Sequence, residues 1–203
     1  RRIVAIHKFI VENQCAQNAA HIVVVCPGDG EKIRKSFHIP ASKITTIFNG
    51  YDETVLPEKK AVSTRPFGDS VHIGYFGKFM YCSPERGAWL LEAINSLRSQ
   101  GIDVALHHIG TPNPLIANYI EKNELDPKIY VGYGDMNYQK GMEMLENMDI
   151  LAMEDVHPTG LGTKIFDYIY LNRPVIAILP RGIYLAEFIQ RFENCYACDS
   201  VQD

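Results

Sequence analysis

From residue 71 onward, apolar segments of strand length alternate regularly with segments of helical length. The expected strands are 71–76, 104–109, 129–133, 149–153, 174–179 and 195–198, and the expected helices lie between them. Because these strands are apolar on both faces, helices must cover both sides of their sheet. Connections of this spacing cross over with a right hand and give parallel pairs. We therefore predict a Rossmann-like, doubly wound α/β domain over residues 71–203.

The first 50 residues predict a second, partial α/β domain. A helix over 1–20, apolar runs at 21–26 and 43–48 and a helix over 31–37 are typical of a fragment of a parallel sheet. Residues 51–70 hold two prolines and several charges with little periodicity. We predict that 51–70 is a linker between a remnant at 1–50 and the domain at 71–203.

The composition argues against several classes of function. A net charge of −4 over 203 residues, without a long basic run, argues against nucleic acid as the main partner. Five scattered cysteines favour a reducing, cytoplasmic location, and Cys195 and Cys198 are read as two residues of a terminal strand. No apolar run approaches the roughly 18–20 residues of a transmembrane segment. No carboxylate cluster suits a divalent cation, so we expect neither metal nor cofactor.

The stretch 157–178, HPTGLGTKIFDYIYLNRPVIAI, reads as a glycine-rich turn, a short helix and a buried strand. Gly160 and Gly162 allow a tight turn close to a ligand, and Thr163 is expected to cap the helix. Lys164 and Asp167, three residues apart, share one helix face. Free amides and a lysine at a helix N-terminus suit a phosphate, and a carboxylate one turn later suits vicinal hydroxyls. An ordinary solvated helix face accounts for the same pair.

Other strand ends carry residues of the same kind. Gly77, Lys78 and Arg86 follow the strand at 71–76, without the third glycine of the dinucleotide fingerprint. Gly110 follows the strand at 104–109. Ligands of such sheets bind at the carboxyl ends of the strands, so these residues and Lys164 are expected to converge on one site that grips a diphosphate. A turn glycine and two surface cations are the alternative.

Three histidines need separate interpretations. His107 and His108 lie within a strand, where a hydrogen-bonded core position is favoured over catalysis. His157 lies in the glycine-rich turn, where it either faces a transferred group or shapes the turn.

Taken together, these segments resemble the nucleotide-sugar half of a GT-B glycosyltransferase of the large retaining group often called group 1. KITTIFNGYDETV is similar to the strand that leads from the acceptor domain toward the donor domain, and IGYFGKFMYCSPERG to the segment that contacts the donor diphosphate. GLGTKIFDYIYLNRPVIA is similar to the glycine turn, acidic helix and proline-valine strand of that group.

The resemblance implies roles for individual residues. Asp167 takes the position of the acid that holds the ribose, where many relatives have glutamate. Thr159 takes the position of a second acid that faces the donor sugar, which is a departure. The expected substrate-binding residues are Gly77, Lys78, Arg86, Gly110, Gly160, Gly162, Thr163, Lys164 and Asp167, with His157 and Thr159 as donor-sugar contacts. No catalytic residue is assigned.

The implied activity is transfer of a hexosyl-type sugar from a UDP- or GDP-sugar to an acceptor hydroxyl, with retention, in glycan or polysaccharide biosynthesis. The acceptor would be a carbohydrate or a lipid-linked molecule, and the full-length protein would have access to a membrane surface. The resemblance also implies a missing acceptor half and missing closing helices, so this piece alone is expected to be inactive. The alternatives are a non-catalytic nucleotide-sugar-binding module that needs a partner chain, an epimerase, or a doubly wound regulatory domain.

Overall fold

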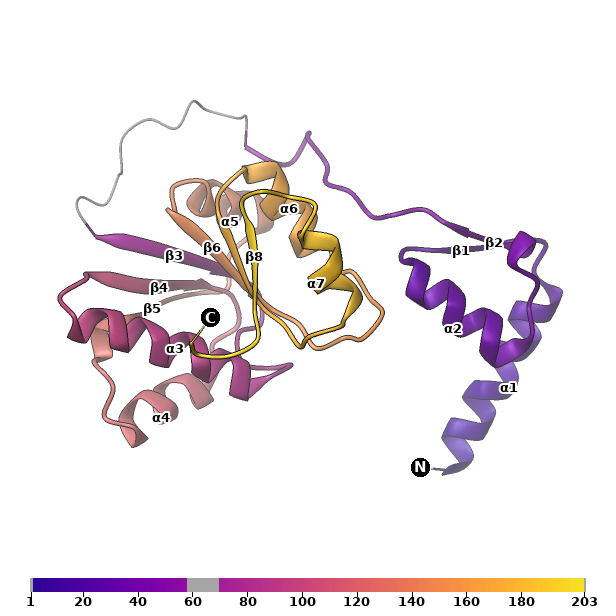
Figure 1. Cartoon of the computed structure of the whole chain (residues 1–203), viewed down its shortest axis with the longest axis horizontal. Coiled ribbons are helices and arrows are strands. Elements are labelled where there is room, and N and C mark those ends of the chain that lie inside the picture. The colour runs from indigo at the N-terminus through magenta and orange to yellow at the C-terminus, as the bar shows by residue number, and fades with distance from the viewer. Residues whose placement is uncertain (1, 58–69, 203) are drawn as a thin grey trace. The chain divides into compact units, whose positions relative to one another are not determined.

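The computed structural model describes residues 2–57 and 70–202, and the side chains from residue 6 onward within these ranges. Contacts divide the chain into two units, which are described separately (Figure 1). The first comprises residues up to 49 together with 157–161, and the second comprises 50–156 and 162–203. Most of the predicted linker at 51–70 lies outside the described residues, because 58–69 are not among them.

The first unit is a two-stranded parallel sheet with two helices. Its elements are α1 (Arg2–Asn18), β1 (Ile22–Val24), α2 (Pro27–Phe37), the 3₁₀ turn η1 (Ala41–Lys43) and β2 (Ile44–Thr46). Helix α2 begins at Pro27, four residues before the predicted start at Glu31. Proline suits the first helical position because its φ is preset and the missing N–H has no partner there anyway.

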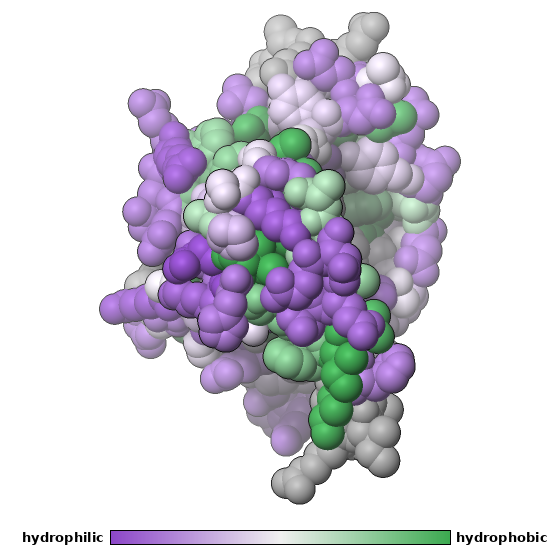
Figure 2. Space-filling model, turned by 90° about the vertical axis from the view of Figure 1, so that its right-hand side faces the viewer, coloured by the Kyte–Doolittle hydropathy of each residue, from purple (hydrophilic) through white to green (hydrophobic). Residues whose placement is uncertain are grey.

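Much apolar surface of the first unit faces solvent. Ile6, Phe9 and Ile10 on α1 are exposed, as are Val23 and Ile47 around the sheet. Figure 2 shows hydrophobic side chains reaching the surface among polar ones on the face that it presents. Two short strands offer little area for a core, so only a few residues of this unit, such as Phe37, are buried.

The second unit contains a six-stranded parallel sheet. Its elements are β3 (Val71–Phe76), α3 (Pro84–Ser99), β4 (Val104–Ile109), α4 (Pro114–Lys122), the 3₁₀ turn η2 (Pro127–Ile129), β5 (Tyr130–Gly134), α5 (Tyr138–Leu145), β6 (Ile150–Glu154), α6 (Lys164–Leu171), β7 (Val175–Ile178), α7 (Tyr184–Ile189) and β8 (Cys195–Cys198). The strand order is β5-β4-β3-β6-β7-β8, and every neighbouring pair is parallel. The predicted Rossmann-like, doubly wound fold is confirmed.

The order of the strands reverses direction between β3 and β6. From β3 the chain moves outward through β4 to β5, then returns to place β6 on the other side of β3. The crossovers diverge at such a switch point and leave a crevice at the carboxyl ends of the two strands, where ligands of open α/β sheets bind. The topology therefore directs attention to the residues that follow Phe76 and precede α6.

The core of this unit holds the central strands rigidly. Ile73 and Tyr75 of β3, Leu106 of β4 and Leu91 and Ile94 of α3 are almost completely buried in one cluster. Burying such a side chain contributes about 1.5–3 kcal/mol relative to leaving it exposed. The strand ends thus have fixed positions on which a site can be built.

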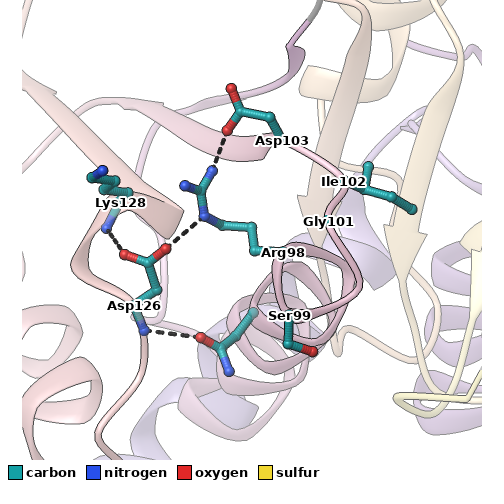
Figure 3. A pocket seen from close by; sticks show the side chains of 8 residues that line it. Arg98, Ser99, Gly101, Ile102, Asp103, Asp126 and Lys128 are labelled. Carbon is teal, nitrogen blue, oxygen red and sulfur yellow. Dashed lines mark hydrogen bonds and ion pairs between the residues drawn. The ribbon is translucent and has the colours of Figure 1, made fainter.

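The amino ends of the strands are joined by an ion-pair cluster (Figure 3). Arg98, at the end of α3, donates to Asp103 and, over 2.8 Å, to Asp126. The amide of Lys128 donates to the other oxygen of Asp126. These residues line a cavity of about 570 Å³, in which Arg98 is already paired with two carboxylates. The cavity lies at the opposite end of the strands from the switch-point crevice and is best explained as part of the scaffold.

Candidate functional site

Two glycines bring the loops after β3 and β4 together. Gly77 has a φ of +107°, which favours glycine, and its amide donates to the carbonyl of Ile109 over 2.8 Å. A Cβ on Gly110 would overlap the carbonyl group of Gly77. Both predicted glycines therefore have a steric reason to be glycine, and they meet at the carboxyl ends of adjacent strands.

Lys164 reaches the same place from the start of α6. A Cβ on Gly77 would lie 3.7 Å from the Lys164 Nζ, and this ammonium lies 4.0 Å from the centroid of the Tyr75 ring. Burial lowers the pKa of Lys164 to about 8, although the carboxylates of Glu154 and Asp155 act in the opposite direction. The structure thus holds a partly desolvated cation directly over the loop after β3.

Glu154 is a buried carboxylate that was missed in the sequence. It ends β6, is 7% exposed, and its Oε1 accepts a hydrogen bond of 2.8 Å from the Met80 amide. Its Oε2 has no hydrogen-bond partner among the described residues. Burial raises the pKa of Glu154 to about 7, and the Met80 hydrogen bond and the charge of Lys164 oppose this shift. An acidic residue directly after the apolar strand at 149–153 was the signal that could have revealed it.

Arg86 is a second predicted cation, but part of its guanidinium already contacts other residues of the protein. Its Nη2 lies 3.5 Å from the Asp199 Oδ1, and its guanidinium lies 4.9 Å from the centroid of Trp89. Its Nη1 is buried and has no hydrogen-bond partner among the residues that the structure describes. Lys78, in contrast, is exposed on the loop after β3. Of the three predicted cations, Lys164 is therefore the one most closely fixed at the strand ends.

Asp167 lies one turn after Lys164, near the end of β3. It is half-buried and accepts a hydrogen bond from the Tyr138 hydroxyl, and the Tyr138 ring meets Phe76 edge-on at 6.1 Å. Burial raises the pKa of Asp167, and the Tyr138 hydrogen bond lowers it. The predicted pair Lys164 and Asp167 thus lies at one strand end and not on a fully solvated helix face.

The predicted capping role of Thr163 is wrong. Thr163 precedes α6, but its φ of −64° and ψ of −31° are already helical, and its side chain makes no capping hydrogen bond. Side-chain capping of a following amide normally needs an extended backbone at that position. A Cβ on Gly162 would lie 3.5 Å from the Asp155 Oδ2, an ordinary contact, so the protein itself requires no close approach there.

The remaining three predicted residues belong to the turn at 157–161, which is described with the first unit. The Gly160 amide donates to His157 Nδ1 over 2.7 Å, so His157 shapes the turn. The Thr159 hydroxyl donates to Asp29 over 2.8 Å. The site around Lys164 in the second unit is therefore described without His157, Thr159 and Gly160.

The paired histidines have the structural role favoured by the sequence. His107 and His108 are both buried, and each bonds a tyrosine hydroxyl of β5 through Nδ1, at 2.9 and 2.8 Å. The Nε2 of His108 also donates to the Gly77 carbonyl over 2.7 Å. His108 therefore touches the loop after β3, which the strand pattern did not indicate.

Two further findings concern the described residues as a whole. Over residues 2–57 and 70–202, no group of three or more His, Cys, Asp or Glu side chains is placed to hold a metal ion. Within the same ranges, no helix combines the length and the hydrophobicity needed to cross a bilayer.

Comparisons with known proteins identify the fold. No protein-family model and no curated protein matches this sequence. Among solved structures, HepE from Anabaena in complex with UDP and glucose has a TM-score of 0.69 at 16% identity, over 95% of this chain and 53% of HepE. TarM has a TM-score of 0.67 at 20% identity, over 97% of this chain and 37% of TarM. WaaG, a glycosyltransferase involved in lipopolysaccharide biosynthesis, has a TM-score of 0.65 at 14% identity, over 86% of this chain and 48% of WaaG.

The chain thus spans about half the length of HepE. At these identities the likeness shows the fold, and the expected GT-B fold is confirmed. The site itself is argued from its own residues. A cation, glycine backbone and a carboxylate at adjoining strand ends can together hold an anion and a neighbouring diol.

The burial of Lys164 leads to a first prediction. Because the folded state lowers the pKa of Lys164 to about 8, it disfavours the charged form. Lys164→Met should therefore raise the free energy of unfolding at pH 7 by about 1 kcal/mol, a figure reduced to allow for partial exposure. Urea unfolding measures this. The advantage should be constant below pH 8 and shrink toward pH 10.5, where the unfolded lysine also loses its proton.

Asp167→Asn is a suitable comparison, since it keeps a hydrogen-bond acceptor for Tyr138. A Lys164→Met variant that is less stable than the unmodified protein at pH 7 would show that the ammonium is not desolvated in the free state.

Proposed function

We propose that this chain binds a nucleoside diphosphate sugar at the carboxyl ends of β3, β4 and β6, as the donor-binding part of a glycosyltransferase. The observation that carries the proposal is the position of Lys164, whose ammonium lies beside Gly77 in a partly buried place. A partly desolvated cation at a switch point is the expected arrangement for holding an anionic ligand.

The charges of the cluster fit a diphosphate. Lys164 can contact one phosphate from α6, while the Arg86 guanidinium, held beside Asp199, adds a second positive charge. Lys78 is exposed on the loop after β3 and can reach a second phosphate. Glycine at position 77 leaves space beside the Lys164 ammonium for a ligand to approach the main chain, and glycine at position 110 lets the two loops meet there. Cations of this kind bind phosphate oxygens through charge-assisted hydrogen bonds.

Asp167 fits the pentose of the same ligand. It lies one turn along α6 from Lys164, so a sugar next to the diphosphate is within reach of its carboxylate. Tyr138 occupies part of the carboxylate, which leaves acceptor capacity for vicinal hydroxyls. Helix α6 thus carries both Lys164, which can bind a phosphate, and Asp167, which can accept hydrogen bonds from two neighbouring hydroxyls. This combination favours a nucleotide over a free sugar phosphate.

The proposed reaction breaks the bond between the sugar and the diphosphate and forms a bond from the sugar to an acceptor hydroxyl, with retention. The proton of that hydroxyl leaves with the nucleoside diphosphate. Lys164, Lys78 and Arg86 would stabilise the negative charge that develops on the departing diphosphate. We propose UDP as the nucleotide and a hexose as the sugar, since HepE is seen with UDP and glucose. A polysaccharide or glycan acceptor is in keeping with WaaG.

Nucleotide binding is the direct test. Lys164→Ala should weaken UDP binding by roughly 10- to 100-fold, because a hydrogen bond to a charged group contributes about 1.5–3 kcal/mol. Asp167→Ala should have an effect of similar size. Titration calorimetry measures both, with Lys128→Ala as control, since Lys128 lies at the amino ends of the strands. The rise in melting temperature with UDP, GDP and ADP shows which base the site prefers. Equal affinity in all variants would remove Lys164 and Asp167 from the site.

The pH dependence of binding follows from the pKa of Lys164. Below pH 8 the ammonium is charged and affinity for UDP should be constant from pH 7. Above pH 8 the affinity should fall, by up to about tenfold per pH unit, until the contribution of Lys164 is lost. Calorimetry from pH 7 to 9.5 tests this, with proton uptake near pH 8 detected in buffers of different ionisation enthalpy. Lys164→Ala should lack this dependence, and a flat profile in the unmodified protein would contradict the assignment.

Turnover distinguishes an enzyme from a binding module. A longer protein that contains this chain should release UDP from UDP-glucose in the presence of acceptor, and Lys164→Ala should reduce the rate at least tenfold. A coupled assay for free UDP measures the release. Tight UDP binding without release would favour the alternative of a non-catalytic nucleotide-sugar-binding module.

A further inference from the structure

The loop after β3, residues 77–80, is held by polar side chains from both strands that flank β3. In the sheet, β4 lies on one side of β3 and β6 on the other. His108, near the end of β4, bonds the first residue of the loop, and Glu154, the last residue of β6, bonds its last residue. Neither side chain is used in the nucleotide contacts proposed above.

At the start of the loop, His108 sets the direction of the Gly77 carbonyl. The ring is 1% exposed, its Nε2 donates to that carbonyl over 2.7 Å, and its Nδ1 accepts from the Tyr130 hydroxyl over 2.8 Å. A carbonyl can only accept, so Nε2 carries a proton, and in the neutral ring Nδ1 is then the acceptor for the Tyr130 hydroxyl. Burial lowers the pKa of His108, which favours the neutral ring, although the hydrogen bond to the Gly77 carbonyl acts in the opposite direction.

At the end of the loop, Glu154 supports a strained backbone. Met80 has a φ of +61°, a left-handed conformation that costs a bulky residue roughly 1–2 kcal/mol. Its amide is bound by the Glu154 Oε1 at 2.8 Å. A buried carboxyl with one oxygen unbonded is itself costly, and an apolar side chain would fill the space without that cost. The hydrogen bond to Met80 is therefore the specific contribution of this residue.

Between these two ends, the loop has its acceptors bonded and two donors available. The Tyr75 hydroxyl donates to the Lys78 carbonyl over 3.3 Å, and Asn113 donates to the Phe79 carbonyl over 3.0 Å. Among the described residues, no acceptor is found for the amides of Lys78 and Phe79. Two successive amides beside the Lys164 ammonium are suited to an anion.

We propose that His108 and Glu154 are positioning residues for the donor site, which fix the loop 77–80 so that its amides and Lys78 are aligned with Lys164 before the ligand arrives. The inference rests on the proposed function and adds two residues that determine its affinity. Neither is a catalytic residue, since each acts through the loop. Such preorganisation reduces the ordering cost of binding.

Substitutions that differ by one group test each end of the loop. His108→Asn keeps a polar group at the position of Nδ1 but loses the hydrogen-bond donor at the position of Nε2. His108→Gln, in contrast, keeps a donor that reaches the Gly77 carbonyl. Glu154→Ala loses the acceptor for the Met80 amide, whereas Glu154→Gln keeps it. We expect His108→Asn and Glu154→Ala to weaken UDP binding at least tenfold, and the two glutamine variants to bind within about threefold of the unmodified protein.

The matched control is His107→Asn. His107 is the neighbour of His108 in β4, is 6% exposed, and bonds His72 and Tyr133 with its two nitrogens at 2.6 and 2.9 Å, but does not touch the loop. It should lower the melting temperature without changing UDP affinity. Calorimetry at pH 6.5 is below the pKa of about 8 of Lys164 and below the pKa of about 7 of Glu154, so Glu154 is mostly neutral and glutamine is a close replacement.

Hydrogen exchange gives a readout that does not depend on nucleotide. The Met80 amide should exchange faster in Glu154→Ala than in the unmodified protein, and at an unchanged rate in His107→Asn. Melting curves identify any variant that does not fold. If a variant at one end of the loop does not fold, the UDP affinity of the variant at the other end tests the proposal.

The outcomes separate the two proposals. If the unmodified protein does not bind UDP, the proposed function is wrong, whatever the exchange rates are. If it binds UDP and both His108→Asn and Glu154→Ala bind equally tightly, the positioning role is wrong and the function stands. Loss of affinity in His107→Asn equal to that in His108→Asn, or in Glu154→Gln equal to that in Glu154→Ala, also overturns the positioning role.

Discussion

The second unit is built around a lysine that the fold keeps partly out of water. The Lys164 ammonium lies over the Tyr75 ring and beside Gly77, and burial lowers its pKa to about 8. Glu154 offsets part of this cost through its charge, at the expense of being buried itself. On the proposed function, free energy of folding is given up to hold a cation where a ligand can contact it, as is usual for binding and catalytic sites.

The parallel sheet makes this arrangement possible. Its strand order places β4 and β6 on either side of β3, so three carboxyl ends that are far apart in sequence meet at one edge. Each supplies a different function: glycine backbone from the loops after β3 and β4, and a buried acid from β6. Helix α6 then adds Lys164 and Asp167 one turn apart. A rigid core behind these ends keeps the loops from relaxing around the charge.

Periodicity predicted the architecture well because it depends on local patterns that every strand and helix repeats. The same reasoning found Lys164 and Asp167, since residues three apart on a helix share a face. It missed the contacts that Glu154 and His108 make with the loop after β3, and it gave Thr163 a capping hydrogen bond that the side chain does not make. Those outcomes depend on which strand becomes the neighbour of β3 and on one backbone torsion, and neither is encoded in the spacing of apolar residues. The pairing of Arg86 with Asp199 is of the same kind, because it depends on the position of β8, the edge strand that Asp199 follows.

The division of the chain has a consequence for how donor binding is organised. On the proposed function, the residues that grip the diphosphate and the pentose all belong to the second unit, from Gly77 to Asp167. His157 and Thr159, the expected donor-sugar contacts, are described with the first unit and already have protein partners. The proposed nucleotide contacts therefore depend on the second unit alone, and their test does not require His157 or Thr159.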